Sequence, residues 1–206
     1  RDRVRHGFRV LKIKGGNYAQ EDVQRVRAVC DAFPEITVRL DADGGYTVQE
    51  AIAVARALEG RIEMLEQPVD PSAGLEASHE VTQHSPVPVL ADQSAIGAES
   101  ALQIAGQHAA DGISIKLATS GGFYKAQQMD SIARAAHLST MVGCVHEPAL
   151  LIAAELAFAL SSPAVRYGDL DGHFDLVGDP TTARFVLQEG TLIATDVPGL
   201  GCTVDL

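Results

Sequence analysis

The sequence predicts an α/β fold in which parallel strands alternate with helices, arranged as a barrel of the (β/α)8 type with one strand missing. Short runs rich in Val, Ile and Leu alternate with Ala-rich segments of helical spacing, and this alternation is typical of βα units. The last polar residues of seven apolar runs recur at intervals of 24 to 28 residues, a stride that suits a βα repeat. These residues are Lys14, Asp41, Glu66, Asp92, Lys116, Cys144 and Asp169.

Each element follows from this alternation. The apolar runs predict strands within residues 10–14, 36–42, 62–68, 87–93, 112–118, 139–144 and 165–171. Helical spacing predicts helices within residues 20–33, 47–60, 98–110, 124–136 and 149–162. Thr47 and Glu50 have the spacing of a capping box, and Gly60 is expected to end the helix that they begin.

The rival fold is a doubly wound open sheet, which concentrates its polar residues at one crevice. Here a charged or polar residue stands at the carboxyl end of nearly every predicted strand. A ring of strand ends around one mouth is the barrel arrangement, so the barrel is preferred. Residues 1–8 resemble the tail of a helix, and a first strand is expected before them. We therefore expect residues 1–206 to form a single domain excised from a longer protein.

Composition excludes several classes of partner and location. The net charge of −11 argues against nucleic acid and against anionic membranes. The three cysteines are few and far apart, which argues against a disulfide framework and favours a reducing, cytoplasmic setting. The longest apolar stretch, residues 149–160, is too short to span a bilayer and contains Glu155, so it is expected to be a buried helix. We also expect a homo-oligomer.

Three acidic residues end three successive predicted strands: Asp41, Glu66 and Asp92. Neighbouring strand ends of a barrel face one mouth, so three carboxylates there would repel one another unless a cation lay between them. Hard oxygen ligands in this number suit Mg²⁺. A single acidic strand end is more simply a helix cap or part of a solvated loop, but three at a matched stride favour the metal site.

Lysines flank this trio on the predicted sheet. Lys12 and Lys14 share one face of a strand because side chains alternate with period two, and Lys116 lies on the other side of the trio. A neighbouring ammonium group and a divalent cation both disfavour a charged lysine. We therefore expect Lys12 to help keep Lys14 neutral and ready to accept a proton. The alternative is that the lysine pair only neutralises the carboxylates.

The last predicted strand carries a further acidic pair. Asp169 and Asp171 are two residues apart, so a strand there would present both on one face. The alternative is a polar loop that follows the strand.

The order of the motifs resembles the enolase superfamily, specifically its muconate lactonizing enzyme subgroup. These motifs are KIK, LDAD, EQP, ADQS, IKLATSGG, MVGC-x-x-E, DLDG and, near the end, PGLG. The resemblance covers the chain from Lys12 to about Asp179, with residues 190–206 as the family's closing segment. It implies a modified (β/α)7β barrel, of which the first strand and an N-terminal capping domain are absent here.

The resemblance also implies roles for individual residues. Asp41, Glu66 and Asp92 would bind Mg²⁺, while Lys14 and Lys116 would be the acid/base groups on opposite faces of the substrate, with Lys12 beside them. The shared chemistry is removal of a proton α to a carboxylate, through an enediolate that the metal stabilises. The acidic pair Asp169 and Asp171 resembles that of dipeptide epimerases, where it holds an α-ammonium group. Glu147 matches a family glutamate with a supporting role at the substrate site.

Two positions depart from the family's pattern, which usually has Asn at Asp43 and Glu at Gln93. HFDL after DLDG also differs from the Pro and leucine run that is usual in dipeptide epimerases. The expected function is a Mg²⁺-dependent racemase or epimerase that acts on an amino-acid-type carboxylate, such as a dipeptide or a proline. The alternatives are a dehydratase of a β-hydroxy amino acid such as cis-3-hydroxyproline, a muconate-type cycloisomerase, and a non-catalytic barrel subunit.

Overall fold

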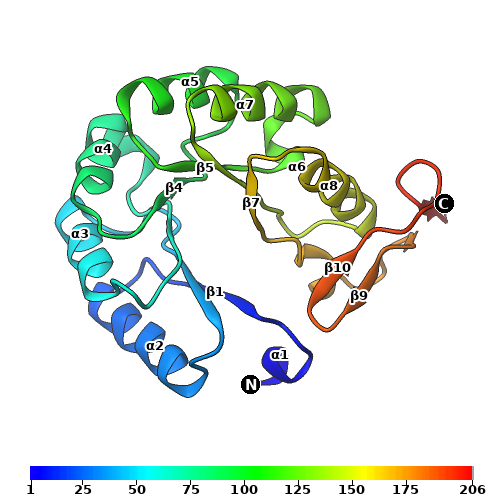
Figure 1. Ribbon diagram of the computed structural model, residues 1–206, viewed down its shortest axis with the longest axis horizontal. Helices are drawn as coiled ribbons and strands as arrows, with labels where there is room; N and C mark the ends of the chain where they lie inside the picture. Colours follow the sequence, from blue (N-terminus) through cyan, green and yellow to red (C-terminus); the bar gives the residue numbers. More distant parts are fainter. Residues whose placement is uncertain (206) are drawn as a thin grey trace. The chain divides into compact units, whose positions relative to one another are not determined.

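A computed structural model describes residues 1–205 and divides the chain into two compact units. The N-terminal unit comprises Arg9–Ile113. The C-terminal unit comprises Arg1–Phe8 together with the chain from Ser114 onward. Each unit is described by itself below, and Figure 1 labels the helices α1 to α8 and some of the strands.

The N-terminal unit is a parallel sheet with helices between its strands. Its strands pair in chain order: β1 (Val10–Lys14), β2 (Thr37–Asp41), β3 (Leu65–Glu66), β4 (Val89–Ala91) and the start of β5 (Gly112–Ile115). The connecting helices are α2 (Ala19–Ala32), α3 (Val48–Ala57), η1 (Pro71–Ala73), α4 (Gly74–His84) and α5 (Ala98–Gln107). Helices α2 to α5 follow one another along the same side of these strands (Figure 1).

The C-terminal unit continues the same alternation and then changes character. It contains the end of β5 and the parallel strands β6 (Ser139–Val142) and β7 (Val165–Gly168). Its helices are α1 (Asp2–Arg5), α6 (Leu117–Ser120), α7 (Phe123–Ala135), α8 (Ala149–Ser161) and η2 (Gly172–Asp175). Two antiparallel pairs follow: β8 (Thr181–Ala183) with β11 (Cys202–Val204), and β9 (Val186–Gln188) with β10 (Thr191–Ile193).

The predicted α/β class and the seven parallel strands are confirmed, each strand within its expected range. All five predicted helices are present. Helix α4 and the short strands β8 to β11 fall outside the expected elements. Helix α4 has only scattered apolar residues, and β8 to β11 are three residues each, too short for a period to stand out.

Strands β2 to β4 of the N-terminal unit are buried along most of their length. Val38, Leu40, Leu65 and Leu90 are each at most 2% exposed. Parallel strands covered on both faces are expected to be this apolar, which makes their charged ends conspicuous. Within residues 1–205, no helix is long and apolar enough to cross a membrane, and all three cysteines are free thiols.

The capping box at the start of α3 is confirmed. The Glu50 backbone N–H donates to the Thr47 hydroxyl at 3.3 Å, and the Thr47 N–H donates to the Glu50 carboxylate at 3.0 Å. Helix α3 itself ends at Ala57, and Gly60 lies in the following turn with a φ of +69°. The cap fixes where the chain re-enters a helix after the end of β2.

Asp22, on α2, holds the turn that follows β1. Its carboxylate is fully buried and accepts hydrogen bonds from the Gly16 N–H at 2.8 Å and the Tyr46 hydroxyl at 2.7 Å. Arg25 pairs with its other oxygen at 3.0 Å. At Gly16, where φ is +92°, a Cβ would stand 2.0 Å from the Ala42 carbonyl oxygen, so only glycine fits this turn. The buried acid therefore ties the end of β1 to the loop after β2.

We expect Tyr46→Phe to lower the free energy of unfolding by about 1.5–3 kcal/mol, because it removes a hydrogen bond to a buried carboxylate. Denaturant unfolding measures this change. Tyr18→Phe is the matched control, since Tyr18 is 67% exposed and its substitution should change stability by less than about 0.5 kcal/mol. Equal effects of the two substitutions would show that Asp22 gains nothing from Tyr46.

Candidate active site

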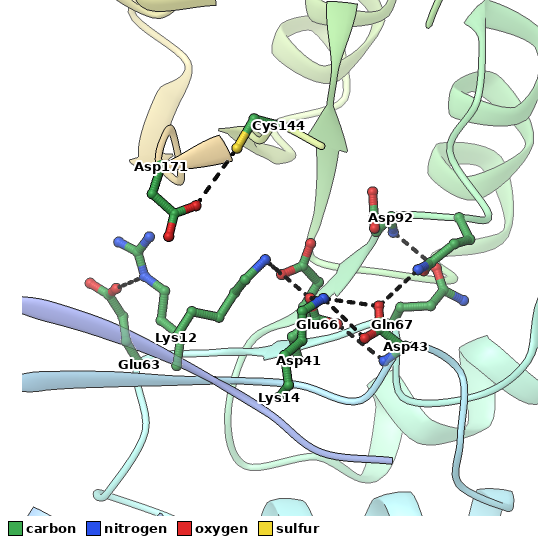
Figure 2. Close-up of polar contacts among 12 residues, drawn as sticks. Lys12, Lys14, Asp41, Asp43, Glu63, Glu66, Gln67, Asp92, Cys144 and Asp171 are labelled. Carbon is green, nitrogen blue, oxygen red and sulfur yellow. Dashed lines mark hydrogen bonds and ion pairs between the residues drawn. The ribbon is translucent and has the colours of Figure 1, made fainter. Parts of the chain in front are cut away.

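The parallel register of three strands places Lys14, Asp41 and Glu66 in one row. Lys14 pairs with Asp41 between β1 and β2, and Asp41 pairs with Glu66 between β2 and β3. Register partners in a parallel sheet project on the same face, and Lys12 shares that face two residues before Lys14. Figure 2 shows the lysine side chains meeting the carboxylates of the row.

Ion pairs connect the members of this row. The Lys12 ammonium group lies 3.0 Å from the Asp41 carboxylate and 3.1 Å from that of Glu66. Lys14 lies 2.7 Å from Asp41 and 2.9 Å from Asp43. Asp41 is 1% exposed and Glu66 is 0% exposed. Because carboxylates this deeply buried need cationic partners, the simple reading of either as a solvated loop residue is excluded.

The neighbours of Lys14 act on its pKa in opposite directions. Burial lowers the pKa of Lys14, but the hydrogen bonds and charges of Asp41 and Asp43 outweigh it, so its pKa lies above the ordinary value. Lys12 acts in the expected direction, as the weakest of these influences. Without a divalent cation, these contacts favour a charged Lys14 and match the alternative of charge neutralisation. The expectation that Lys12 and a bound metal together keep Lys14 neutral stays a prediction. Burial raises the pKa of Asp41, but the two lysines bring it below its ordinary value.

Asp92 follows β4 and is 6% exposed. Glu66 is the register partner of Leu90, so Asp92 lies one step further along the same face. Gln67, 2% exposed, accepts hydrogen bonds through Oε1 from the backbone N–H groups of Asp92 at 2.9 Å and Ser94 at 3.1 Å. Its amide group donates to the Val69 carbonyl and to the Ser94 hydroxyl.

All four hydrogen bonds that the Gln67 amide can form are thus made. This glutamine belongs to the EQP motif but was not among the predicted site residues. Its role was hidden because it acts on the backbone of the next strand end, 25 residues away. The available signal in the sequence was its position: Gln67 is a polar residue directly after the candidate ligand Glu66.

The two departures from the family's pattern contact each other. The Gln93 amide donates to Asp43 at 3.1 Å, and Asp43 also receives Lys14. The Asp43 N–H donates to Asp41 at 3.1 Å. Asp43 and Gln93 therefore form the exposed rim of the same cluster in the N-terminal unit.

Three buried carboxylates supply hard oxygen donors that fit Mg²⁺ by their chemistry. As the side chains stand, no group of three or more His, Cys, Asp or Glu residues within residues 1–205 is arranged to hold a metal ion. The cation between Asp41 and Glu66 is the Lys12 ammonium group. The magnesium site therefore stays a prediction.

In the C-terminal unit, Lys116 follows β5 and begins α6. Its side chain lies across Gly143, at the end of β6: a Cβ at Gly143 would stand 3.1 Å from Lys116 Cε and 3.1 Å from Ser114 Oγ. A larger residue at position 143 would have to displace the lysine or the serine. The glycine of the MVGC motif therefore provides space for the Lys116 side chain.

Asp169 and Asp171 do not share a strand face. Strand β7 ends at Gly168, and Asp171 begins the 3₁₀-helix η2, so the alternative of a polar loop is correct. The Asp169 N–H still donates to the Val142 carbonyl, whereas Asp171 is exposed and accepts a weak hydrogen bond from Cys144 at 3.8 Å. Burial and the charge of Asp169 raise the pKa of Cys144 to about 12, so this cysteine is a thiol and not a nucleophile.

Glu147 precedes α8 and is 3% exposed. It contacts Glu155 on α8. The sequence predicted that Glu155 lies in a buried helix, but it did not predict Glu147 as its partner. A carboxylate this deeply buried has little surface to offer a substrate, which suits the supporting role expected for Glu147.

The chain is similar to known proteins in both sequence and fold. The family model described as "Enolase C-terminal domain-like" matches residues 1–206. The L-Lys-D/L-Arg epimerase of Desulforapulum autotrophicum is 36% identical over 197 residues, which are 95% of this chain and 55% of that protein. The chain thus spans about half the length of the curated relatives that it matches.

Two solved structures are similar over almost the whole chain. The substrate-liganded L-Ala-D/L-Glu epimerase of Bacillus subtilis has a TM-score of 0.94 and 30% identity, covering 100% of this chain and 58% of that one. The dipeptide epimerase of Cytophaga hutchinsonii, complexed with Mg and the dipeptide D-Ala-L-Val, has a TM-score of 0.92 and 30% identity, covering 98% and 55%. From these matches, the chain belongs to the enolase superfamily, as a C-terminal domain of the muconate lactonizing enzyme subgroup.

Proposed function

We propose that this chain carries the metal-binding and acid–base residues of a Mg²⁺-dependent racemase or epimerase acting on an amino-acid-type carboxylate, such as a dipeptide or a proline-like acid. The observation that carries the proposal is the row of Lys14, Asp41 and Glu66 on neighbouring strand ends, joined by Lys12. The epimerase names of the relatives support it, as does the Mg and dipeptide complex of the Cytophaga hutchinsonii structure.

Asp41, Glu66 and Asp92 would hold the Mg²⁺ ion. When bound, the ion supplies positive charge beside the substrate's carboxylate, which favours loss of the neighbouring α-proton. The buried position of these three side chains strengthens their attraction for a cation, because little water competes for their oxygens. Lys12, already between Asp41 and Glu66, would remain the fixed positive neighbour of the site.

Lys14 and Lys116 would move the proton. In the neutral form, one lysine amine takes the α-proton while the electron pair of the C–H bond stays on the substrate. The other lysine, as an ammonium group, returns a proton to the opposite face and inverts the centre. Lys14 must leave its contacts with Asp41 and Asp43 to act as a base, since those contacts hold its proton.

Asp169 and Asp171 would bind the substrate's α-ammonium group. Asp171 is exposed at the start of η2, so its carboxylate is accessible to a ligand. Glu147 would have a supporting role through its contact with Glu155, as developed in the next subsection.

The decisive experiment is α-proton exchange in D₂O with Mg²⁺, on the full chain, across amino acids, prolines, dipeptides, a β-hydroxyproline and a muconate-type acid. Exchange with inversion of dipeptides or amino acids is the expected result. Loss of water from the hydroxyproline would favour the dehydratase, and turnover of the muconate-type acid the cycloisomerase. No exchange on any substrate would favour the non-catalytic subunit.

We expect Lys14→Ala and Lys116→Ala each to lower turnover by about 10²- to 10⁴-fold, because each removes a general acid/base group. One of the variants should still exchange the α-proton of a single enantiomer. Single-turnover kinetics with each enantiomer measure both effects. Near-normal turnover of Lys116→Ala would exclude two-base racemisation and favour a one-base dehydratase.

We expect Asp171→Asn to lower kcat/KM for amine-bearing substrates by about 10- to 100-fold, because it removes a charge-assisted hydrogen bond to the ammonium group. Steady-state kinetics on the best substrate measure the change. The control is Asp175→Asn, which alters an exposed carboxylate on η2. If both variants lower kcat/KM by a similar factor, or if the best substrate lacks an amine, Asp171 does not bind an ammonium group.

We expect Gln67→Leu to weaken Mg²⁺ binding by about 10- to 100-fold, the usual cost of losing a residue that orients a metal ligand. The backbone N–H groups of Asp92 and Ser94 would lose their acceptor, which frees the Asp92 loop. Calorimetric titration with Mg²⁺, without substrate, measures the affinity. Gln103→Leu, an exposed change on α5, is the control and should bind Mg²⁺ normally.

A further inference from the structure

Two glutamates lie buried against each other in the C-terminal unit. Glu155, on α8, is 0% exposed, and Glu147, just before α8, is 3% exposed. Glu155 Oε1 accepts a hydrogen bond from the Leu117 N–H at 3.0 Å. Glu155 Oε2 and both carboxylate oxygens of Glu147 are buried and, among the described residues, receive no donor.

Two ionised carboxylates in this arrangement would be strongly unfavourable. Each buried charge loses its hydration, and the two like charges repel at close range. A carboxylate only accepts hydrogen bonds, whereas a protonated carboxyl group donates one. A single proton therefore changes two repelling acceptors into a donor and an acceptor, and it gives Glu155 Oε2 and one carboxylate oxygen of Glu147 a partner.

The surroundings identify the residue that carries this proton. Burial, followed by the hydrogen bond and the charge of Glu147, raises the pKa of Glu155 far above its ordinary value, while the Leu117 N–H and Lys116 act weakly in the opposite direction. A proton on Glu155 at neutral pH would let this residue donate to Glu147. The pair then carries one negative charge.

This charge lies next to a residue of the proposed reaction. Leu117, which donates to Glu155, directly follows Lys116, and Lys116 is the cation that attracts Glu155. We infer that Glu147 and Glu155 share one proton and act together as a singly charged positioning pair for Lys116 and the start of α6. The sharing of the proton is independent of the activity, whereas its consequence for Lys116 rests on the proposed function.

The test compares thermal unfolding of the full chain and of Glu155→Gln from about pH 4.5 to 9, a range that begins near the ordinary pKa of a glutamate. In the native protein Glu155 keeps a proton that the unfolded chain releases above its ordinary pKa, so this residue reduces stability increasingly as the pH rises. Glutamine donates the same hydrogen bond without needing a proton. The Tm of Glu155→Gln minus that of the parent should therefore rise with pH.

If Glu155 were ionised and stabilised in the native protein, the Tm difference would not rise with pH, because glutamine would then remove a stabilised charge. A Tm difference that stays constant or falls with pH would overturn the proposal. Asp130→Asn is the matched control: Asp130 is buried in the same unit but accepts from Ser162 and pairs with Arg134 at 3.9 Å. Its replacement should give no gain in Tm at high pH.

A second measurement is made on the parent protein, so its main result does not depend on how well the variants fold. The infrared spectrum of the parent protein at neutral pH should contain the C=O band of a buried protonated carboxylic acid. The spectra of Glu147→Gln and Glu155→Gln, compared with that of the parent, assign the band to this pair. The band should be lost in Glu155→Gln. A parent spectrum without this band would overturn the shared proton, whether the pair is ionised or holds a cation.

The positioning role has a separate kinetic readout. Glu155→Leu removes both the acceptor of the Leu117 N–H and the donor to Glu147, so it should lower the exchange that depends on Lys116 by at least 10-fold. Glu155→Gln should recover most of this loss. If Leu and Gln behave alike, the pair does not position Lys116. If the infrared band is present but no α-proton exchange is found on any substrate, the shared proton is supported and the proposed function is contradicted.

Discussion

The parallel register of β1, β2 and β3 is the constraint on which the candidate site depends. Because partners across a parallel sheet project on the same face, the pairings Lys14 with Asp41 and Asp41 with Glu66 bring lysines and acids into one row. A shift of one residue in any strand would turn its charged side chain to the other face and into apolar packing. The polar interactions around the row, from Asp22 at the turn after β1 to Gln67 beside Asp92, hold the strand ends in this register.

Both units bury acids and balance them by different means. In the N-terminal unit, lysine ammonium groups lie against Asp41 and Glu66, and the resulting ion pairs lower the pKa of Asp41. In the C-terminal unit, Glu155 meets Glu147, and a proton is the simplest counter-charge that fits between two carboxyl groups. The first arrangement pairs buried carboxylates with ammonium groups, whereas the proton proposed for the second would keep one acid neutral. Residues of one type thus acquire different chemistry from their neighbours.

Much of the fold could be predicted from the sequence, because strand stride, helical spacing and the Thr47 capping box are local properties of the chain. The row of strand-end charges also followed from the stride. The placement of Asp171 did not, because Gly168 ends β7 and the chain turns into η2, which a period of two cannot reveal. The pKa of Lys14 is raised first by Asp41 and then by Asp43, and the contact with Asp43 comes from the loop after β2, which the strand pattern does not reveal. The roles of Gln67 and Glu155 were missed for the same reason. Gln67 accepts from the backbone N–H of Asp92, 25 positions away, and Glu155 from that of Leu117, 38 positions away.

Two residues at the mouth of the site, Asp43 and Gln67, have φ angles of +46° and +35°. A side chain with Cβ is disfavoured in this region, and each such residue costs on the order of 1–3 kcal/mol. Glycine would relieve the strain at either position, but it would remove the carboxylate that receives Lys14 or the amide that holds Asp92. The chain therefore keeps a less stable backbone in exchange for fixed polar groups. A glycine at either position would relax the backbone and at the same time free a neighbouring strand end, so these two residues are places where the ease of the local backbone and the order of the candidate site oppose each other.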